Sequence, residues 1–190
     1  WVKEEDEKYK YAAKQKGYEP LYFAPDHFEE GDLKILAYNY GIAPLAPMPH
    51  SSVYLCNEGY GLIKYKSDRY GFRNNDIMWD NPKIKILLVG DSYTHGACVE
   101  DKNSIAGMLN LNNFKTINLG ISGNGPMQYA ATVQQFIKVI DTEYIVMIFS
   151  SNDNIINDWD NTYENLFFKN KIKYFDDQKN ISDNLTIVYK

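Results

Sequence analysis

The residues of this chain best suited to covalent chemistry lie in one short turn, Gly90-Asp91-Ser92. The apolar run from Ile84 to Val89 comes directly before it, and such a run is typical of a strand that is buried on both faces of a parallel sheet. Asp91 and Ser92 are good helix N-caps, because their oxygens accept hydrogen bonds from amides of the first turn. A hydroxyl between the end of a buried strand and a helix N-terminus is well placed for nucleophilic attack on a bound ligand. The same residues also suit a plain turn and cap, so the chemistry needs support from elsewhere in the chain.

Strands and helices alternate after this turn. The predicted elements are, in order, a helix over 104–111, a strand over 116–119, a helix over 127–140 and a strand over 144–149. Such short strand–helix–strand steps indicate right-handed crossovers and a parallel sheet in a three-layer α/β/α sandwich. Because the carboxyl ends of parallel strands meet at one sheet edge, we expect the Ser92 turn to lie beside the loops 120–126 and 150–154.

Three blocks in this part of the chain resemble the SGNH (GDSL-like) hydrolase family. They are Gly90-Asp91-Ser92, Asn118-Leu119-Gly120-Ile121-Ser122-Gly123 and Ser151-Asn152-Asp153, in the family's order and each after a predicted strand. The resemblance covers about residues 84–154 and implies the flavodoxin-like SGNH hydrolase fold. It also implies that Ser92 is the nucleophile and that the Gly123 amide and the Asn152 side chain form the oxyanion hole. The family often has glycine before the Asn-Asp pair, where this chain has Ser151.

Acyl transfer at a serine needs an activated hydroxyl, donors aimed at the developing oxyanion, and a base that carries the proton. Side chains near the blocks are candidates for binding the substrate. They are Asp91, Asn124 and Asp153, together with Arg69 and Arg73 in a turn before the first strand. The two arginines suit structural ion pairs as well as recognition of an anionic or sugar substrate.

The base is the missing part of this constellation. SGNH hydrolases take it from an Asp-x-x-His block near the C-terminus, and this sequence has no such block and no histidine after His95. Three hypotheses stay open. In the first, the chain is a fragment whose final strand, helix and Asp-x-x-His lie beyond Lys190. In the second, His27 or His50 serves as the base, since related alginate-type acetyltransferases place their Asp/His pair before the serine. In the third, His95, one helical turn past Ser92, acts directly.

Residues 1–80 read as an N-terminal extension, and residues 81–190 as the α/β domain, incomplete at its C-terminus. The extension begins with a charged surface helix over 1–17 and continues as a proline-rich irregular cover over 18–49. Alternation over 62–66 then predicts an edge hairpin. The chain has two cysteines, Cys56 and Cys98, which form either a disulfide or two separate buried thiols.

Composition narrows the classes of partner. A chain of 190 residues fits one domain with an extension. The net charge of −5 argues against nucleic acid as a partner, because binding to its phosphates relies on clustered Lys and Arg. No apolar run approaches the roughly 20 residues of a membrane-spanning helix. No metal-ligand spacing occurs, and the resemblance implies no cofactor. The chain begins at Trp1 rather than Met, so we expect a processed or trimmed product.

These observations predict a serine esterase, O-acyltransferase or deacetylase of the SGNH type, acting on an acyl ester. Family usage and aromatic richness (16 Tyr, 9 Phe and 3 Trp) favour a carbohydrate as the carrier of the acyl group. The alternative is a non-catalytic glycan-binding or assembly protein on the same fold. A nucleotide binder is disfavoured, because the Gly-x-Gly-x-x-Gly and P-loop signatures are absent. From such a substrate we expect a location in the cell envelope, in the periplasm or outside the cell. A cytoplasmic location is the alternative.

Overall fold

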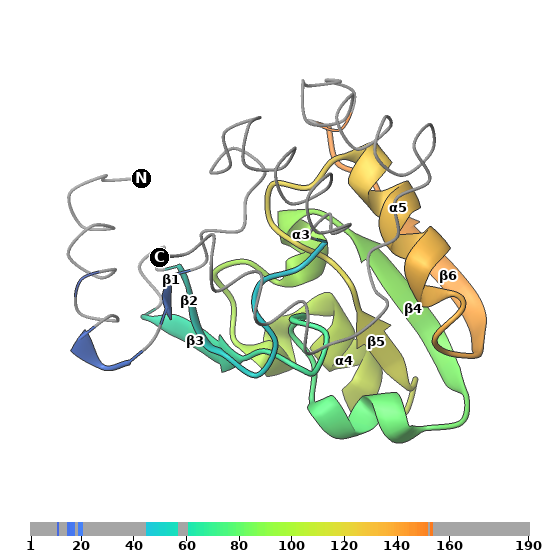
Figure 1. The fold of residues 1–190 in the computed structure, drawn as a ribbon, viewed down its shortest axis with the longest axis horizontal. Helices are drawn as coiled ribbons and strands as arrows, with labels where there is room; N and C mark the ends of the chain where they lie inside the picture. Colours follow the sequence, from blue (N-terminus) through green and yellow to red (C-terminus); the bar gives the residue numbers. More distant parts are fainter. Residues whose placement is uncertain are drawn as a thin grey trace, which may run out of the picture.

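The computed structural model describes residues 11, 15–17, 19–20, 45–56, 61–151 and 153. In this part of the chain the architecture is mixed α/β, with two three-stranded sheets (Figure 1). The predicted helix over 1–17 and the cover over 18–49 lie largely outside the described residues, as do His27 and Asn152. No helix of the described residues is long and apolar enough to cross a membrane.

The central sheet is parallel and has the order β5-β4-β6. Its middle strand is β4 (Ile84–Gly90), flanked by β5 (Thr116–Asn118) and β6 (Thr142–Ile148). Leu87 and Leu88 of β4 are almost fully buried, as expected for a strand covered on both faces. The predicted parallel sheet is therefore confirmed, and the carboxyl ends of all three strands point to one edge.

The described residues include three α-helices that follow strands of the central sheet. They are α3 (Ser92–His95), α4 (Ile105–Leu111) and α5 (Pro126–Phe136), with single 3-10 turns at η2 (Asp76–Asp80) and η3 (Asp101–Asn103). Ser104 caps α4, its hydroxyl accepting from the Gly107 amide at 3.0 Å. The helix predicted to reach residue 140 ends earlier, because an i to i+3 hydrogen bond from the Val139 amide to the Phe136 carbonyl tightens the chain into a turn.

The N-terminal sheet has the order β1-β2-β3. Its hairpin joins β2 (Ser52–Cys56) to β3 (Ile63–Lys66), and the two-residue β1 (Glu19–Pro20) runs parallel to β2. The hairpin predicted from the alternation over 62–66 is thus present. A disulfide joins Cys56, at the end of β2, to Cys98, in the loop after α3. It ties the N-terminal sheet to the segment that follows Ser92.

The two parts of the chain share one apolar core. Phe136 of α5 packs edge-on against Phe72, with ring centroids 5.2 Å apart, and also contacts Trp79 and Tyr70. Leu45, Ala46, Phe72 and Trp79 therefore belong to the same buried cluster as residues of the central sheet and α5. They close one face of the core built by β4, β5 and α5.

A buried carboxylate organises the turn that precedes the central sheet. Asp68 is fully buried and accepts from the Trp79 indole at 2.8 Å, the Asn74 amide group at 2.8 Å, and the backbone amides of Tyr70 and Phe72. Burial raises the pKa of Asp68, while these donors act in the opposite direction. Asn74 also exchanges two hydrogen bonds with the backbone of Asn118, at 2.8 and 2.9 Å. The extension is therefore fastened to the strand whose end enters the candidate site.

Candidate functional site

The serine turn is held by Asp91. Its Oδ1 accepts from the Tyr93 amide at 3.0 Å and caps α3, while its Oδ2 accepts from the Ser150 hydroxyl at 2.7 Å. Asp91 is 2% exposed, and both of its carboxylate oxygens are engaged in these contacts. Ser92 is half-buried at the first position of α3. Its hydroxyl has no hydrogen-bond partner among the described residues.

Two glycines let the strand ends approach α3 closely. A Cβ on Gly90 would lie 2.1 Å from Thr94 Oγ1 and 2.9 Å from the Ile148 carbonyl. A Cβ on Gly120 would lie 2.6 Å from the backbone nitrogen of His95. All three distances are below van der Waals contact. The loops at this edge therefore meet because glycine stands at these two positions.

The loop after β5 runs across the end of β4. The backbone amides of Leu119 and Ile121 donate to the carbonyls of Leu88 and Gly90, at 2.7 and 3.1 Å. The Asn118 side chain is buried and donates to the Thr94 carbonyl at 2.8 Å. These contacts carry the loop past α3.

The predicted oxyanion residue and its neighbour stand further along this loop. Gly123 is exposed and has a φ of +86°, which favours glycine. Asn124 is buried, and its backbone carbonyl accepts from the Tyr129 hydroxyl at 3.2 Å.

The loop after β6 is tied to the serine turn. Ser150 donates from its hydroxyl to Asp91, and its backbone amide donates to Asp153 Oδ2 at 2.6 Å. Asp153 Oδ1 accepts from the Tyr129 hydroxyl at 2.8 Å, so this carboxylate also has a structural role. Asn152, the other predicted oxyanion residue, lies between Ser151 and Asp153 but outside the described residues.

His95 is fully buried, and both of its ring nitrogens are engaged. Nδ1 accepts from the Ser122 amide at 3.2 Å and lies 3.1 Å from the Ser122 hydroxyl, while Nε2 lies 3.1 Å from the Tyr65 hydroxyl. Burial, with the positive charge of Arg73 nearby, lowers the pKa of His95 to about 3. The imidazole is therefore neutral near pH 7, and no hydrogen bond links it to Ser92 among the described residues.

His50 does not reach this edge either. It is exposed in the turn before β2, and its backbone amide donates to the Asp68 carbonyl at 3.1 Å. The described residues thus bring together Ser92, the Gly123 loop and the Ser150 turn, and they provide no histidine bonded to the serine.

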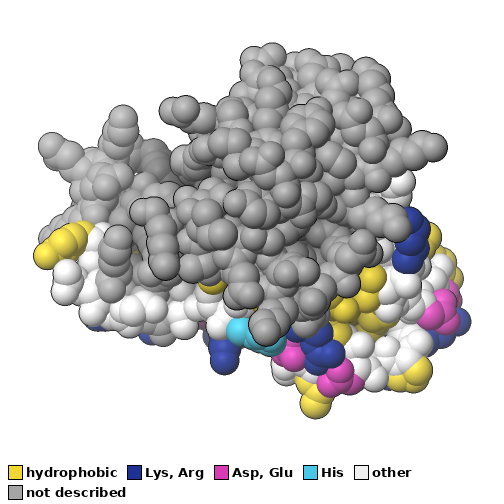
Figure 2. Space-filling view, viewed as in Figure 1, with side chains coloured by type: hydrophobic (Ala, Val, Ile, Leu, Met, Phe, Trp, Pro, Cys, Tyr) yellow, Lys and Arg dark blue, Asp and Glu magenta, His cyan; other side chains and the backbone are white. Residues whose placement is uncertain are grey.

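The two arginines make structural contacts. Arg69 pairs with Asp76 and Asp80, at 2.8 and 2.7 Å. Arg73 is buried and donates to the carbonyls of Gly96 and Val99, at 2.7 and 3.0 Å, which braces the loop after α3. Figure 2 shows acidic and basic side chains of the described residues next to one another.

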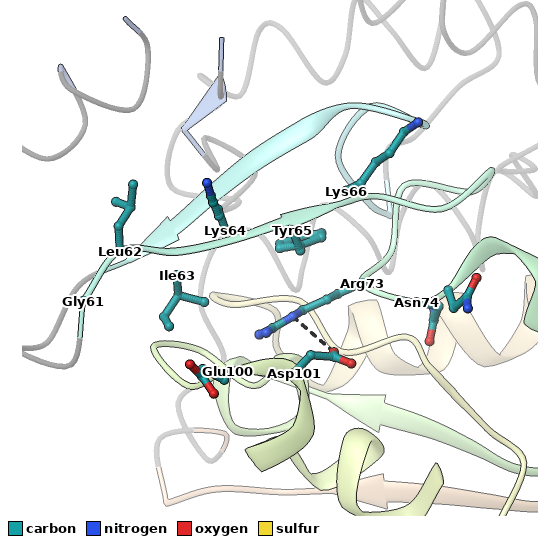
Figure 3. A pocket seen from close by; sticks show the side chains of 11 residues that line it. Gly61, Leu62, Ile63, Lys64, Tyr65, Lys66, Arg73, Asn74, Glu100 and Asp101 are labelled. Carbon is teal, nitrogen blue, oxygen red and sulfur yellow. Dashed lines mark ion pairs between the residues drawn. The ribbon is translucent and has the colours of Figure 1, made fainter. Parts of the chain in front are cut away.

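A pocket of about 450 Å³ lies beside Arg73. Figure 3 shows it between β3 and the Glu100–Asp101 turn, with Tyr65, Arg73 and Asn74 among its walls. Neither Ser92 nor Gly123 lines it. Among the described residues, no group of three or more His, Cys, Asp or Glu side chains is placed to hold a metal ion.

The sequence did not single out three of the residues that build the site. Tyr65 reads only as part of an alternating strand, and Ser122 and Ser150 read only as loop residues. Their roles depend on partners far away in the chain. Comparison of the chain with protein-family models, with curated proteins and with solved structures found no match in any of the three.

Proposed function

We propose that this chain is the SGNH-type module of a serine esterase, O-acyltransferase or deacetylase that acts on an acyl ester carried by a carbohydrate. The observation that carries the proposal is the convergence of three loops at one edge of the parallel sheet, with Ser92 at the start of α3. Hydrogen bonds from the Ser122 amide to His95 Nδ1 and from the Ser150 hydroxyl to Asp91 hold these loops together. The order β5-β4-β6 also supports a flavodoxin-like three-layer SGNH fold.

In the proposed reaction, Ser92 Oγ attacks the ester carbonyl carbon and gives up its proton to a base. The carbonyl oxygen becomes an oxyanion, which accepts hydrogen bonds from the amides of Ser92 and Gly123 and from the side chain of Asn152. The intermediate collapses as the sugar alkoxide leaves and takes the proton from the base. Water or an acceptor hydroxyl then attacks the acyl-enzyme and frees Ser92. No metal or nucleotide takes part.

The base in this proposal comes from outside the site that the structure describes. His95 is engaged on both nitrogens, so the remaining sources are His27, His50 after a change of conformation, or an Asp-x-x-His segment beyond Lys190. We favour the last, because it is the family's arrangement.

We also propose a location in the cell envelope or outside the cell. The disulfide between Cys56 and Cys98 supports this, since such bonds persist in oxidising compartments. An acylated envelope polysaccharide is a substrate of the expected kind.

Labelling with a fluorophosphonate probe tests the function. The probe forms a covalent bond with an activated serine, so labelling that maps to Ser92 and disappears in Ser92→Ala is the expected result. Ser52→Ala, a half-buried serine in β2, is the matched control and keeps its labelling. Labelling of the 190-residue chain itself means that its own residues supply the base, and labelling only of a longer native form places the base beyond Lys190.

A second candidate is a glycan-binding or assembly protein on the same fold. It is favoured by one observation: the Ser92 hydroxyl has no base bonded to it among the described residues. If neither form of the protein reacts with the probe, and titration calorimetry shows binding of an acetylated oligosaccharide without loss of its ester, this second function replaces the first.

A further inference from the structure

We propose that His95 is a positioning residue: its Nδ1 holds the loop after β5 so that the Gly123 amide faces the developing oxyanion. The inference rests on the proposed function and adds a role that the family resemblance does not assign. It also gives His95, the histidine nearest to Ser92 in the sequence, a positioning role in place of the role of base.

The first step of the argument is the anchoring of the loop on both sides of Gly123. On one side the Ser122 amide donates to His95 Nδ1 at 3.2 Å. On the other side the Asn124 amide donates to the Ile121 carbonyl at 3.2 Å. Gly123, exposed and at a φ of +86°, is the residue between these two fixed points. Loss of the His95 contact would free the peptide that carries the Gly123 amide.

The second step is the tautomer of the ring. A backbone amide can only donate, so Nδ1 must be the unprotonated nitrogen, and the proton of the neutral ring sits on Nε2. Nε2 then donates to the Tyr65 hydroxyl at 3.1 Å. Tyr65 belongs to β3. The guanidinium carbon of Arg73 lies over the face of the Tyr65 ring, 5.4 Å from the ring centroid (Figure 3). The Ser122 amide therefore fixes the tautomer, and the Tyr65 hydroxyl, which can donate or accept, serves as the partner of the other ring nitrogen.

The third step is the position of His95 in α3. The helix has Ser92 at its first position and His95 at its last, and the His95 amide donates to the Asp91 carbonyl at 2.8 Å. One turn of helix thus carries both the nucleophile and the group that fixes the oxyanion loop. The single helix α3 therefore sets the distance between Ser92 and the residue that positions the Gly123 loop.

Two substitutions of the same histidine separate its two contacts. In His95→Asn the side-chain oxygen stands where Nδ1 stood, so it accepts from Ser122, while the link to Tyr65 is lost. In His95→Gln the longer amide reaches toward Tyr65, and the acceptor for Ser122 is lost. Both variants bury one neutral amide, so differences in folding largely cancel. Tyr65→Phe removes only the far partner and keeps Nδ1 in place.

The measurement is the second-order rate of fluorophosphonate labelling at Ser92, in whichever form of the protein labels. We expect His95→Asn and Tyr65→Phe to stay within about threefold of the natural chain, and His95→Gln to fall by roughly 10- to 100-fold, since removal of a whole oxyanion donor costs about 100- to 1,000-fold. Equal losses in Asn and Gln, or a Gln variant that labels normally, would overturn the proposal.

Amide hydrogen exchange at Ser122 provides a readout that does not depend on activity. We expect protection in the natural chain and in His95→Asn, and faster exchange in His95→Gln. If no form labels while this exchange pattern appears, the proposed function fails although the His95 contact is real. If labelling occurs but exchange at Ser122 is the same in both variants, the function stands and the positioning role is refuted.

Discussion

A histidine acts as a base only when one ring nitrogen is free to take a proton. His95 lies one helical turn from Ser92, but Ser122 and Tyr65 occupy its two nitrogens and burial keeps it neutral. Short sequence distance therefore does not make it the catalytic base. At the residue scale, its buried neutral state has a measurable consequence for stability.

Stability should fall as the pH is lowered through the usual range of histidine. The pKa of His95 is lowered in the folded state to about 3 from 6.5, so the unfolded chain takes up a proton that the folded chain does not. This contribution is present above pH 6.5 and is lost as the pH falls. We expect the free energy of unfolding to drop by about 2 kcal/mol more in the natural chain than in His95→Asn between about pH 7.5 and about pH 5.

Urea unfolding of both proteins across this range gives the comparison. Because every other titrating group is shared, the difference between the two curves reports His95 alone. Parallel curves would mean that His95 titrates alike in the folded and unfolded states.

At the scale of elements, the junction of β4, β5 and α3 depends on glycine. Gly120→Ala would place a Cβ 2.6 Å from the His95 backbone nitrogen and from Thr94, neither of which can move without displacing α3. We expect a loss of about 1–3 kcal/mol in unfolding free energy and slower labelling of Ser92. Denaturant unfolding and probe kinetics measure the two effects.

Gly61→Ala is the control for backbone strain without crowding. Gly61 has a φ of +102°, and no atom of the described residues, its chain neighbours aside, lies within 4 Å of the added Cβ. If both variants lose the same stability, close approach to α3 is not what selects glycine at position 120.

Elements were predictable to the extent that their signals are local. The strand ahead of Gly90 follows from a continuous apolar run, and the cap at Asp91 from its residue type. The end of α5 was not predictable in this way, because apolar spacing continues to Ile140 while the backbone tightens into a turn after Phe136.

The site was predictable only in its outline, as three loops at one sheet edge. Its bonds join residues that are far apart in the chain: 59 positions from Asp91 to Ser150, 30 from Tyr65 to His95 and 27 from His95 to Ser122. No local pattern encodes such pairs. The packing of Leu45, Phe72 and Trp79 into the core of the central sheet escaped prediction for the same reason, since the proline-rich sequence over 18–49 predicted only an irregular cover.

At the scale of the whole molecule, one covalent link joins the two sheets. The Cys56–Cys98 disulfide spans 42 positions of sequence, and cross-linking a loop of that length stabilises by about 3–4 kcal/mol when the main effect is on the unfolded chain. We expect the free energy of unfolding of the double variant Cys56→Ser/Cys98→Ser to be lower by that amount. The variant should therefore unfold at a lower denaturant concentration.

The natural chain in reductant should match this variant, while reductant should leave the variant itself unchanged. A reductant-insensitive natural chain would show that the bond contributes little. Because the bond anchors the loop between His95 and η3, we also expect slower Ser92 labelling after reduction.

The enclosure of His95 bears on how chemical modification of this protein is interpreted. Diethyl pyrocarbonate carbethoxylates neutral imidazoles that solvent can reach, and His95 offers it neither an accessible surface nor a free nitrogen lone pair. His50, on the exposed turn before β2, is open to the reagent. Inactivation of the folded protein by this reagent, reversed by hydroxylamine, would therefore report a histidine other than the one beside the serine.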